Sequence, residues 1–133
     1  MLLLTDMLQL IILKKGEVMK KALIIFTVLI LANPTFARPS WCRNAHTSVE
    51  KRICHNRYLI DLDYELADVY YRIAHFLKRV DRSLYRKFVQ NEKEWIRERN
   101  TDCYGMPDSC IERKYHQRIE LLYSFLRKIE EEL

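Results

Sequence analysis

Residues 59–80 have the sequence LIDLDYELADVYYRIAHFLKRV. The steps between apolar residues in this stretch alternate between three and four, which is the spacing of one face of an α-helix. The residues on this face are Leu59, Leu62, Leu66, Val69, Ile73, Phe76 and Val80. No glycine or proline interrupts the chain between Trp41 and Tyr104. The stretch therefore predicts a long amphipathic helix in an all-α protein.

Further helices are predicted on both sides of this one. Thr47 and Glu50 have the spacing of a capping box, which begins a short helix that runs to about Cys54. The second apolar stripe consists of Leu84, Phe88 and Trp95, with Tyr85, Val89 and Ile96 beside them. The third consists of Ile111, Tyr115, Ile119, Leu122, Phe125 or Leu126, and Ile129.

Two short breaks separate the long helices. One lies at residues 80–83, where Asp81 or Ser83 can cap the next helix, and the other at residues 104–109. Short connections make successive helices antiparallel neighbours. We therefore expect a small antiparallel bundle of three long helices plus a short N-terminal helix.

The N-terminal part of the chain predicts a secretory signal peptide. Residues 19–21 (MKK) form a basic start, residues 22–31 an apolar run, and residues 35–37 (TFA) a cleavage signal. The apolar run is too short to span a bilayer, and no lipidation cysteine follows it. No permanent membrane anchor is expected.

These features set the expected boundaries of the mature protein. We expect Met19 to be the true start, which leaves residues 1–18 upstream of it. Cleavage near Ala37 would release residues 38–133 as a single helical domain, either periplasmic or secreted.

The composition gives no indication of an enzyme or of a nucleic-acid-binding protein. The 23 basic and 18 acidic residues give a formal net charge of +5, but the charges are mixed along the chain without a long basic block. No glycine-rich loop and no Ser/His/Asp pattern is present. We expect no catalytic residue, no cofactor and no nucleic-acid partner, whereas the oligomeric state is left open.

Four cysteines follow the leader: Cys42, Cys54, Cys103 and Cys110. An even number of cysteines in a short exported chain predicts disulfides, and four cysteines allow three connectivities. We expect local pairing, because Cys103 and Cys110 flank the one break that contains glycine and proline, while Cys42 and Cys54 flank the entry into the short helix.

Zinc binding is the alternative for these cysteines, with Cys42 and His46, and Cys54 and His55, as ligands. The adjacent Cys54 and His55 cannot easily point at one metal from a regular helix, and the spacings are not those of paired zinc knuckles. We therefore expect two disulfides and no metal.

Several short motifs in this order resemble the N-terminal domain of LprI-type lysozyme inhibitors, a family of small exported bacterial proteins. The motifs are residues 49–54 (VEKRIC), residues 62–66 (LDYEL) with Tyr70, residues 95–99 (WIRER) leading to Cys103, and then Cys110 and Arg118. The resemblance covers roughly residues 42–126. It implies a protein that binds and blocks a lysozyme.

The chain departs from the family in two places. The family commonly has glutamine three residues before the tryptophan, where this chain has Glu92, which we expect to form an ion pair with Arg99 or a neighbour. The best-known member of the family is a lipoprotein, whereas this chain has no lipidation signal.

The motif residues are interpreted as structural. Trp95, Arg99 and Cys103 recur every four residues, so they share one helix face, with Trp95 in the core. Arg99 is placed to meet Glu50, Asp63 or Glu92, because a buried charge needs a partner. Together with Arg118, these residues are expected to build the scaffold.

Two surfaces are candidates for binding a partner. The first is the loop of residues 104–109, with Tyr104, Met106, Asp108 and Ser109, because a disulfide at its base and Pro107 would reduce the entropy lost on binding. The second is the acidic helix face formed by Asp61, Glu65 and Asp68, which would attract a basic lysozyme. A helix connection that binds nothing and a solvated helix face are the simpler alternatives.

The partner is expected to be a protein. A lysozyme is the first hypothesis. The alternative is an exported interaction module, such as a toxin-neutralising or envelope-stress partner, which would use the same bundle against a different target.

Overall fold

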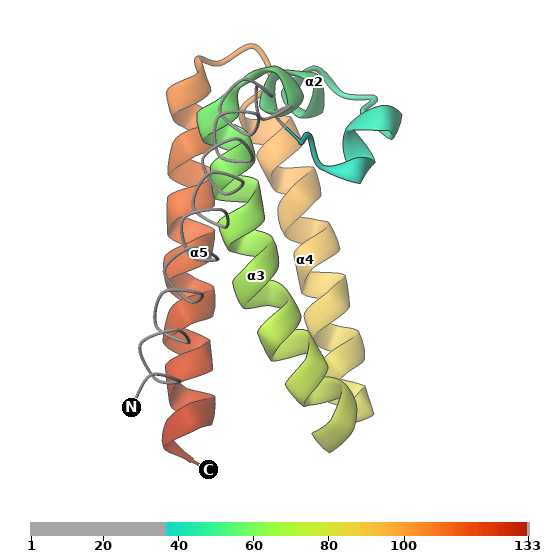
Figure 1. Cartoon of the computed structure of the whole chain (residues 1–133), viewed down its shortest axis with the longest axis vertical. Coiled ribbons are helices and arrows are strands. Elements are labelled where there is room, and N and C mark those ends of the chain that lie inside the picture. The colour runs from blue at the N-terminus through green and yellow to red at the C-terminus, as the bar shows by residue number, and fades with distance from the viewer. Residues whose placement is uncertain (1–36, 133) are drawn as a thin grey trace, which may run out of the picture. The chain divides into compact units, whose positions relative to one another are not determined.

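The computed structural model describes residues 37–132, whose regular elements are all helices, with no strand (Figure 1). The expected start and nearly all of the expected signal peptide lie outside the described residues. The elements are a 3-10 helix η1 (Ser40–Asn44) and the α-helices α2 (Ser48–His55), α3 (Arg57–Val80), α4 (Arg82–Asp102) and α5 (Asp108–Glu131). The predicted all-α fold and the predicted break at residues 80–83 are confirmed.

Short-range hydrogen bonds define the helix starts. The predicted capping box begins α2, since Thr47 Oγ1 accepts from the Glu50 backbone at 3.1 Å and the Glu50 carboxylate accepts from the Thr47 backbone at 3.0 Å. Asn56 caps α3, and Asp81 rather than Ser83 caps α4. Helices α2, α3 and α4 therefore begin where a polar side chain satisfies free N–H groups of the first turn, whereas α5 follows Pro107 without a side-chain cap.

Helix α3 packs against both α4 and α5, and the three long helices alternate in direction (Figure 1). The buried residues of α3 are Leu59, Ile60, Leu62, Leu66, Val69, Ile73, Ala74 and Leu77. Val80, the last residue of the predicted stripe, is 66% exposed, so that part of the prediction was wrong. The stripe ends one turn earlier because Val80 is the last residue of α3 and lies beyond the packed part of the bundle.

Helix α4 buries charged rather than apolar residues. Its buried residues are Glu92 and Arg99, whereas Phe88 and Trp95 are only partly buried and Leu84 is exposed. The partial burial of Trp95 differs from the expected core position. Helix α4 therefore contributes polar groups to the interior, and these groups shape the surface described below.

No helix within residues 37–132 is both long and apolar enough to cross a membrane.

Candidate functional site

The connection between α4 and α5 is a short exposed loop, and a disulfide closes its base. Cys103 and Cys110 are bonded, with their Cα atoms 5.6 Å apart. Gly105 turns the loop with a positive φ of 68°, and the Met106 backbone N–H donates to the Cys103 carbonyl at 3.1 Å. Tyr104 is 74% exposed and Met106 47% exposed. The loop therefore presents an aromatic ring and a thioether from a closed turn.

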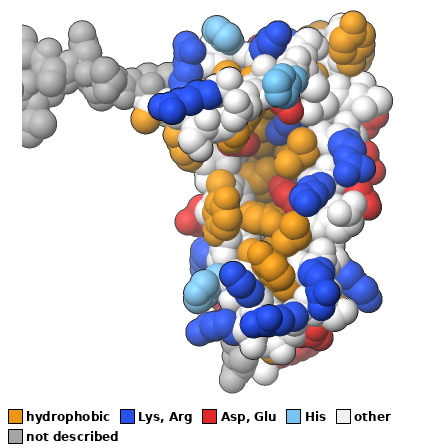
Figure 2. Space-filling view, turned by 90° about the vertical axis from the view of Figure 1, so that its right-hand side faces the viewer, with side chains coloured by type: hydrophobic (Ala, Val, Ile, Leu, Met, Phe, Trp, Pro, Cys, Tyr) orange, Lys and Arg blue, Asp and Glu red, His pale blue; other side chains and the backbone are white. Residues whose placement is uncertain are grey.

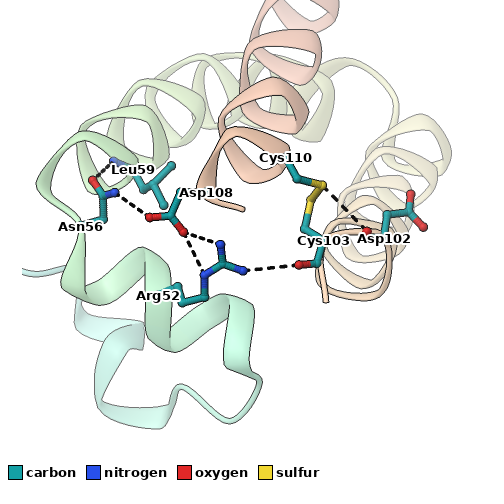
Figure 3. Close-up of polar contacts among 7 residues, drawn as sticks. All are labelled: Arg52, Asn56, Leu59, Asp102, Cys103, Asp108 and Cys110. Carbon is teal, nitrogen blue, oxygen red and sulfur yellow. Dashed lines mark hydrogen bonds and ion pairs between the residues drawn. A yellow bond between two sulfur atoms is a disulfide. The ribbon is translucent and has the colours of Figure 1, made fainter. Parts of the chain in front are cut away.

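The loop ends earlier than predicted, because Asp108 and Ser109 belong to the first turn of α5. The Asp108 carboxylate forms an ion pair with Arg52 of α2 and accepts from the Asn56 amide at 3.1 Å (Figure 3). Arg52 also donates to the Cys103 carbonyl at 3.5 Å. Asp108 thus ties α5 to α2 instead of standing free in the loop, whereas Ser109 is exposed.

The predicted local disulfide pairing is confirmed. Cys42 and Cys54 form the second bridge, with Cα atoms 5.8 Å apart, and it attaches η1 to α2. Because all four sulfur atoms are in disulfides, they are not free to act as the thiolate ligands of the zinc alternative. Among residues 37–132, no group of three His, Cys, Asp or Glu side chains could hold a metal ion.

A groove of about 360 Å³ lies between η1, α3 and α4. Its walls hold four of the five residues that the sequence assigned to the scaffold, Glu50, Asp63, Trp95 and Arg99. The other lining residues are Trp41, Asn44, Leu66, Glu92 and Ile96. A shallower extension continues past Tyr70, Tyr71, Val89 and Lys93. The face in Figure 2 shows a strip of hydrophobic side chains, hollowed toward its upper end and bordered by charged side chains.

A chain of hydrogen bonds holds one wall of this groove. Arg99 donates to the Tyr115 hydroxyl at 2.9 Å, Tyr115 donates to Asp63 at 2.8 Å, and the Trp41 indole N–H donates to the other Asp63 oxygen at 2.9 Å. Burial raises the pKa of Tyr115 well above its ordinary value, and the Arg99 charge offsets this only in part. Tyr115 therefore stays protonated and can donate to Asp63.

Arg99 meets carboxylates only through intermediates, which corrects the predicted direct contact. Its guanidinium donates to Asn100 at 2.9 and 3.0 Å, and Asn100 donates to Glu50 at 3.2 Å. Tyr115 occupies the position between Arg99 and Asp63 in the same way. Within residues 37–132, Arg99 forms no ion pair with a carboxylate.

Glu92 pairs instead with Arg118 of α5, at 2.7 and 3.1 Å, and Asn91 accepts a further bond from Arg118. The expectation of an ion pair for Glu92 is confirmed, with a neighbour from another helix as its partner. The Trp95 ring lies against the guanidinium groups of both Arg99 and Arg118. The guanidinium carbons are 5.4 Å (Arg99) and 5.8 Å (Arg118) from the ring centre. The pair therefore joins α4 to α5 beside the groove.

The acidic residues Asp61, Glu65 and Asp68 are all exposed on α3. Asp68 lines a shallow depression that also contains the basic residues Arg72 and Lys78. Arg72 forms an exposed ion pair with Glu130 at 3.4 Å. Basic side chains therefore interrupt the acidic face at its C-terminal end.

The groove was missed because Glu50, Asp63, Trp95 and Arg99 had been given structural roles, and Trp41 and Asn44 had been given none. The signal that could have found it is that Glu50, Asp63, Trp95 and Arg99 all belong to one set of motifs, and that the second tryptophan, Trp41, stands just before that set. These residues lie on four different elements, and only the packing of those elements brings them around one space.

Protonation of Glu50 should weaken the domain. Burial raises the pKa of Glu50, but hydrogen bonds from the Thr47 and His46 backbones and from Asn100 outweigh it and lower the pKa below the ordinary 4.5. A lowered pKa adds stability above the ordinary value, and this stability is lost as the pH falls through the lowered pKa. Glu50→Gln should cost about 1 kcal/mol near pH 7.

Unfolding titrations across the acid range test this expectation. The difference between Glu50→Gln and the parent should shrink as the pH falls, because the protonated Glu50 resembles glutamine. Glu98→Gln, an exposed change on α4, is the control and should show no such convergence. A constant gap at every pH would contradict the role given to the Glu50 charge.

The fold and its surfaces define a class: a small helical domain with two disulfides, an exposed closed loop and an adjoining groove. The chain belongs to the lysozyme inhibitor LprI family, since the family model described as "Lysozyme inhibitor LprI" matches residues 42–122. The predicted resemblance is thereby confirmed, and the family is one of inhibitors rather than enzymes. Neither the curated proteins nor the solved structures that were searched gave a match.

Proposed function

We propose that this protein is an exported inhibitor that binds a lysozyme and blocks its substrate cleft. Membership of the LprI family supports this class of activity. A lysozyme acts through two carboxylates that flank the scissile bond inside a cleft. An inhibitor needs only to fill or cover that cleft, so no catalytic group is required of it.

The proposed contact surface is the loop of residues 104–107. The main support for it is that Tyr104 is exposed on a loop that the Cys103–Cys110 disulfide closes. A closed loop loses little conformational entropy on binding. Tyrosine and methionine are also enriched at the centres of interfaces. Ser109 follows the loop in the first turn of α5, and Asp108 holds Arg52, which in turn donates to the Cys103 carbonyl at the start of the loop.

Charge contributes less to the proposed interaction. Asp61, Glu65 and Asp68 would attract a basic lysozyme, but residues 38–133 contain 19 Lys and Arg and 16 Asp and Glu, a formal net charge of +3. Affinity should therefore rest on local fit at the loop. The expected compartment is the periplasm or the medium, with cleavage near Ala37 and residues 38–133 as one domain, and two disulfides are consistent with that compartment.

Tyr104→Ala should weaken inhibition about 30-fold, which corresponds to about 2 kcal/mol for an aromatic hot spot. The measurement is the rate of cell-wall lysis by lysozymes of several classes at increasing concentrations of the oxidised protein. Leu121→Ala, an exposed apolar residue on α5 outside both proposed contact surfaces, is the control and should leave inhibition unchanged.

Two results would count against the proposal in different ways. Unchanged inhibition by Tyr104→Ala would remove the loop from the interface. Unchanged lysis at large molar excess of the parent protein, for every lysozyme class, would remove lysozyme as the target and favour the alternative of another exported partner.

A further inference from the structure

We propose that the groove between η1, α3 and α4 binds a short neutral saccharide of one or two rings. This site goes beyond lysozyme inhibition and does not depend on it. Its volume of about 360 Å³ lies within the range of small-ligand pockets, which runs from roughly 300 to 1,000 Å³. Like such pockets, it combines aromatic walls with a few fixed polar groups.

The aromatic walls are the two tryptophans of the chain, Trp41 and Trp95. Both are half-buried, and both are held in place: the Trp41 indole N–H donates to Asp63 at 2.9 Å, and Trp95 makes an edge contact with Tyr115 at 5.5 Å between ring centres. Indole faces are apolar and can cover the C–H face of a sugar ring. Because the rings are already fixed, binding would order few side chains.

The charges around the groove nearly balance. Three carboxylates line it, from Glu50, Asp63 and Glu92. Opposite them are the Arg99 guanidinium in the wall and Lys93 in the extension, while Arg118 neutralises Glu92 from α5. A site that is polar yet nearly neutral favours neither a cation nor an anion. It suits hydroxyl groups, each of which can both donate and accept.

Two polar groups remain open toward the groove. Glu92 is only 9% exposed, and its Oε2 binds Arg118, but its Oε1 accepts no hydrogen bond from the described residues. No fully buried polar side-chain atom lacks a partner in residues 37–132, so this oxygen is accessible to solvent, on a side chain that lines the groove. The side-chain amide of Asn44 likewise makes no hydrogen bond to any of the described residues. Together they offer an acceptor and a donor to a ligand.

Tryptophan fluorescence tests the site directly, because both tryptophans of the chain line the groove. The oxidised protein is titrated with two neutral disaccharides, N,N′-diacetylchitobiose and cellobiose. Two charged disaccharides are compared with them: chitobiose, which is the deacetylated diamine, and cellobiouronic acid. At least one neutral sugar should give a saturable change with a Kd of roughly 1 mM, and both charged sugars should bind at least about fivefold more weakly.

Variants on η1 locate the binding. Asn44→Ala should weaken binding of the neutral sugar about fivefold to tenfold, since it removes one hydrogen bond without altering the core. Arg43→Ala, the exposed neighbour that does not line the groove, should leave the affinity unchanged. Circular dichroism checks that both variants remain helical.

The outcomes separate this site from the proposed function. No saturable change with either neutral disaccharide, or tighter binding of the diamine or the acid, would overturn the saccharide site whatever the lysis assay shows. Equal affinity of Asn44→Ala and the parent would also overturn it. A failure to inhibit lysozyme would leave the fluorescence result unaffected.

Discussion

Removal of both disulfides is expected to lower the free energy of unfolding by about 5 kcal/mol. The bridges join residues 12 and 7 positions apart, for which the chain-entropy estimate gives about 3 and about 2.5 kcal/mol. A small domain has a total stability of only about 5 to 15 kcal/mol. Reductant should therefore leave the domain largely unfolded or marginally stable.

Urea unfolding followed by circular dichroism, with and without reductant, measures this effect. A variant with all four cysteines changed to serine is the control, because its stability should be low and insensitive to reductant. Cys42→Ser with Cys54→Ser should also change tryptophan fluorescence, since that bridge holds η1 and Trp41 beside the groove. An unfolding midpoint that does not move in reductant would contradict the prediction.

Arg118→Met is expected to destabilise the domain by about 3 to 5 kcal/mol. Arg118 is 6% exposed and forms two of its hydrogen bonds with Glu92, so the change leaves a buried carboxylate without its cation. It also removes the contact of the guanidinium with Trp95. The loss of stability arises mainly because the Glu92 carboxylate is left buried without a cation, and less because its attraction to Arg118 is lost.

A second change distinguishes these two causes. Adding Glu92→Leu to Arg118→Met removes the stranded carboxylate, so most of the lost stability should return. Arg72→Met, which breaks the exposed pair with Glu130, should cost less than about 1 kcal/mol. If Arg118→Met lowered the free energy of unfolding no more than Arg72→Met does, the prediction that the buried Arg118–Glu92 pair stabilises the packing of α4 against α5 would be wrong.

Asn100 connects the loop and the groove through hydrogen bonds with Glu50 and Arg99. Asn100 lines the depression beside Tyr104, and it donates to Glu50, which lines the groove. A partner that covered Tyr104 could therefore extend over the groove. Lysis assays in the presence of the saccharide would reveal whether the two surfaces are used together.

Most of the helical architecture could be predicted from the sequence. The apolar spacing of residues 59–80, the capping box of Thr47 and Glu50, and the cap at Asp81 each depend on residues within one or two turns of helix. The disulfide pairing was predictable for a similar reason, since each bridge joins cysteines close in the sequence.

The partners of the buried charges were less predictable. Arg99 was expected to meet a carboxylate, but Asn100 and Tyr115 stand between it and Glu50 and Asp63. Any of several acids could have been its partner from sequence spacing alone. The choice depends on how α4 is rotated against α3 and α5, and no short stretch of sequence contains that information.

The sequence by itself determined the helices, most of their ends, the local disulfides and the family, because periodicity, caps and short loops are properties of neighbouring residues. Only the tertiary structure decided what the motif residues do together. Trp41 and Asp63 are 22 positions apart, and Asp63 and Tyr115 are 52 apart, yet they are hydrogen-bonded in one wall of the groove. Such contacts form only when separate helices pack, so the groove and the true partners of Arg99 and Asp108 belong to the packed bundle.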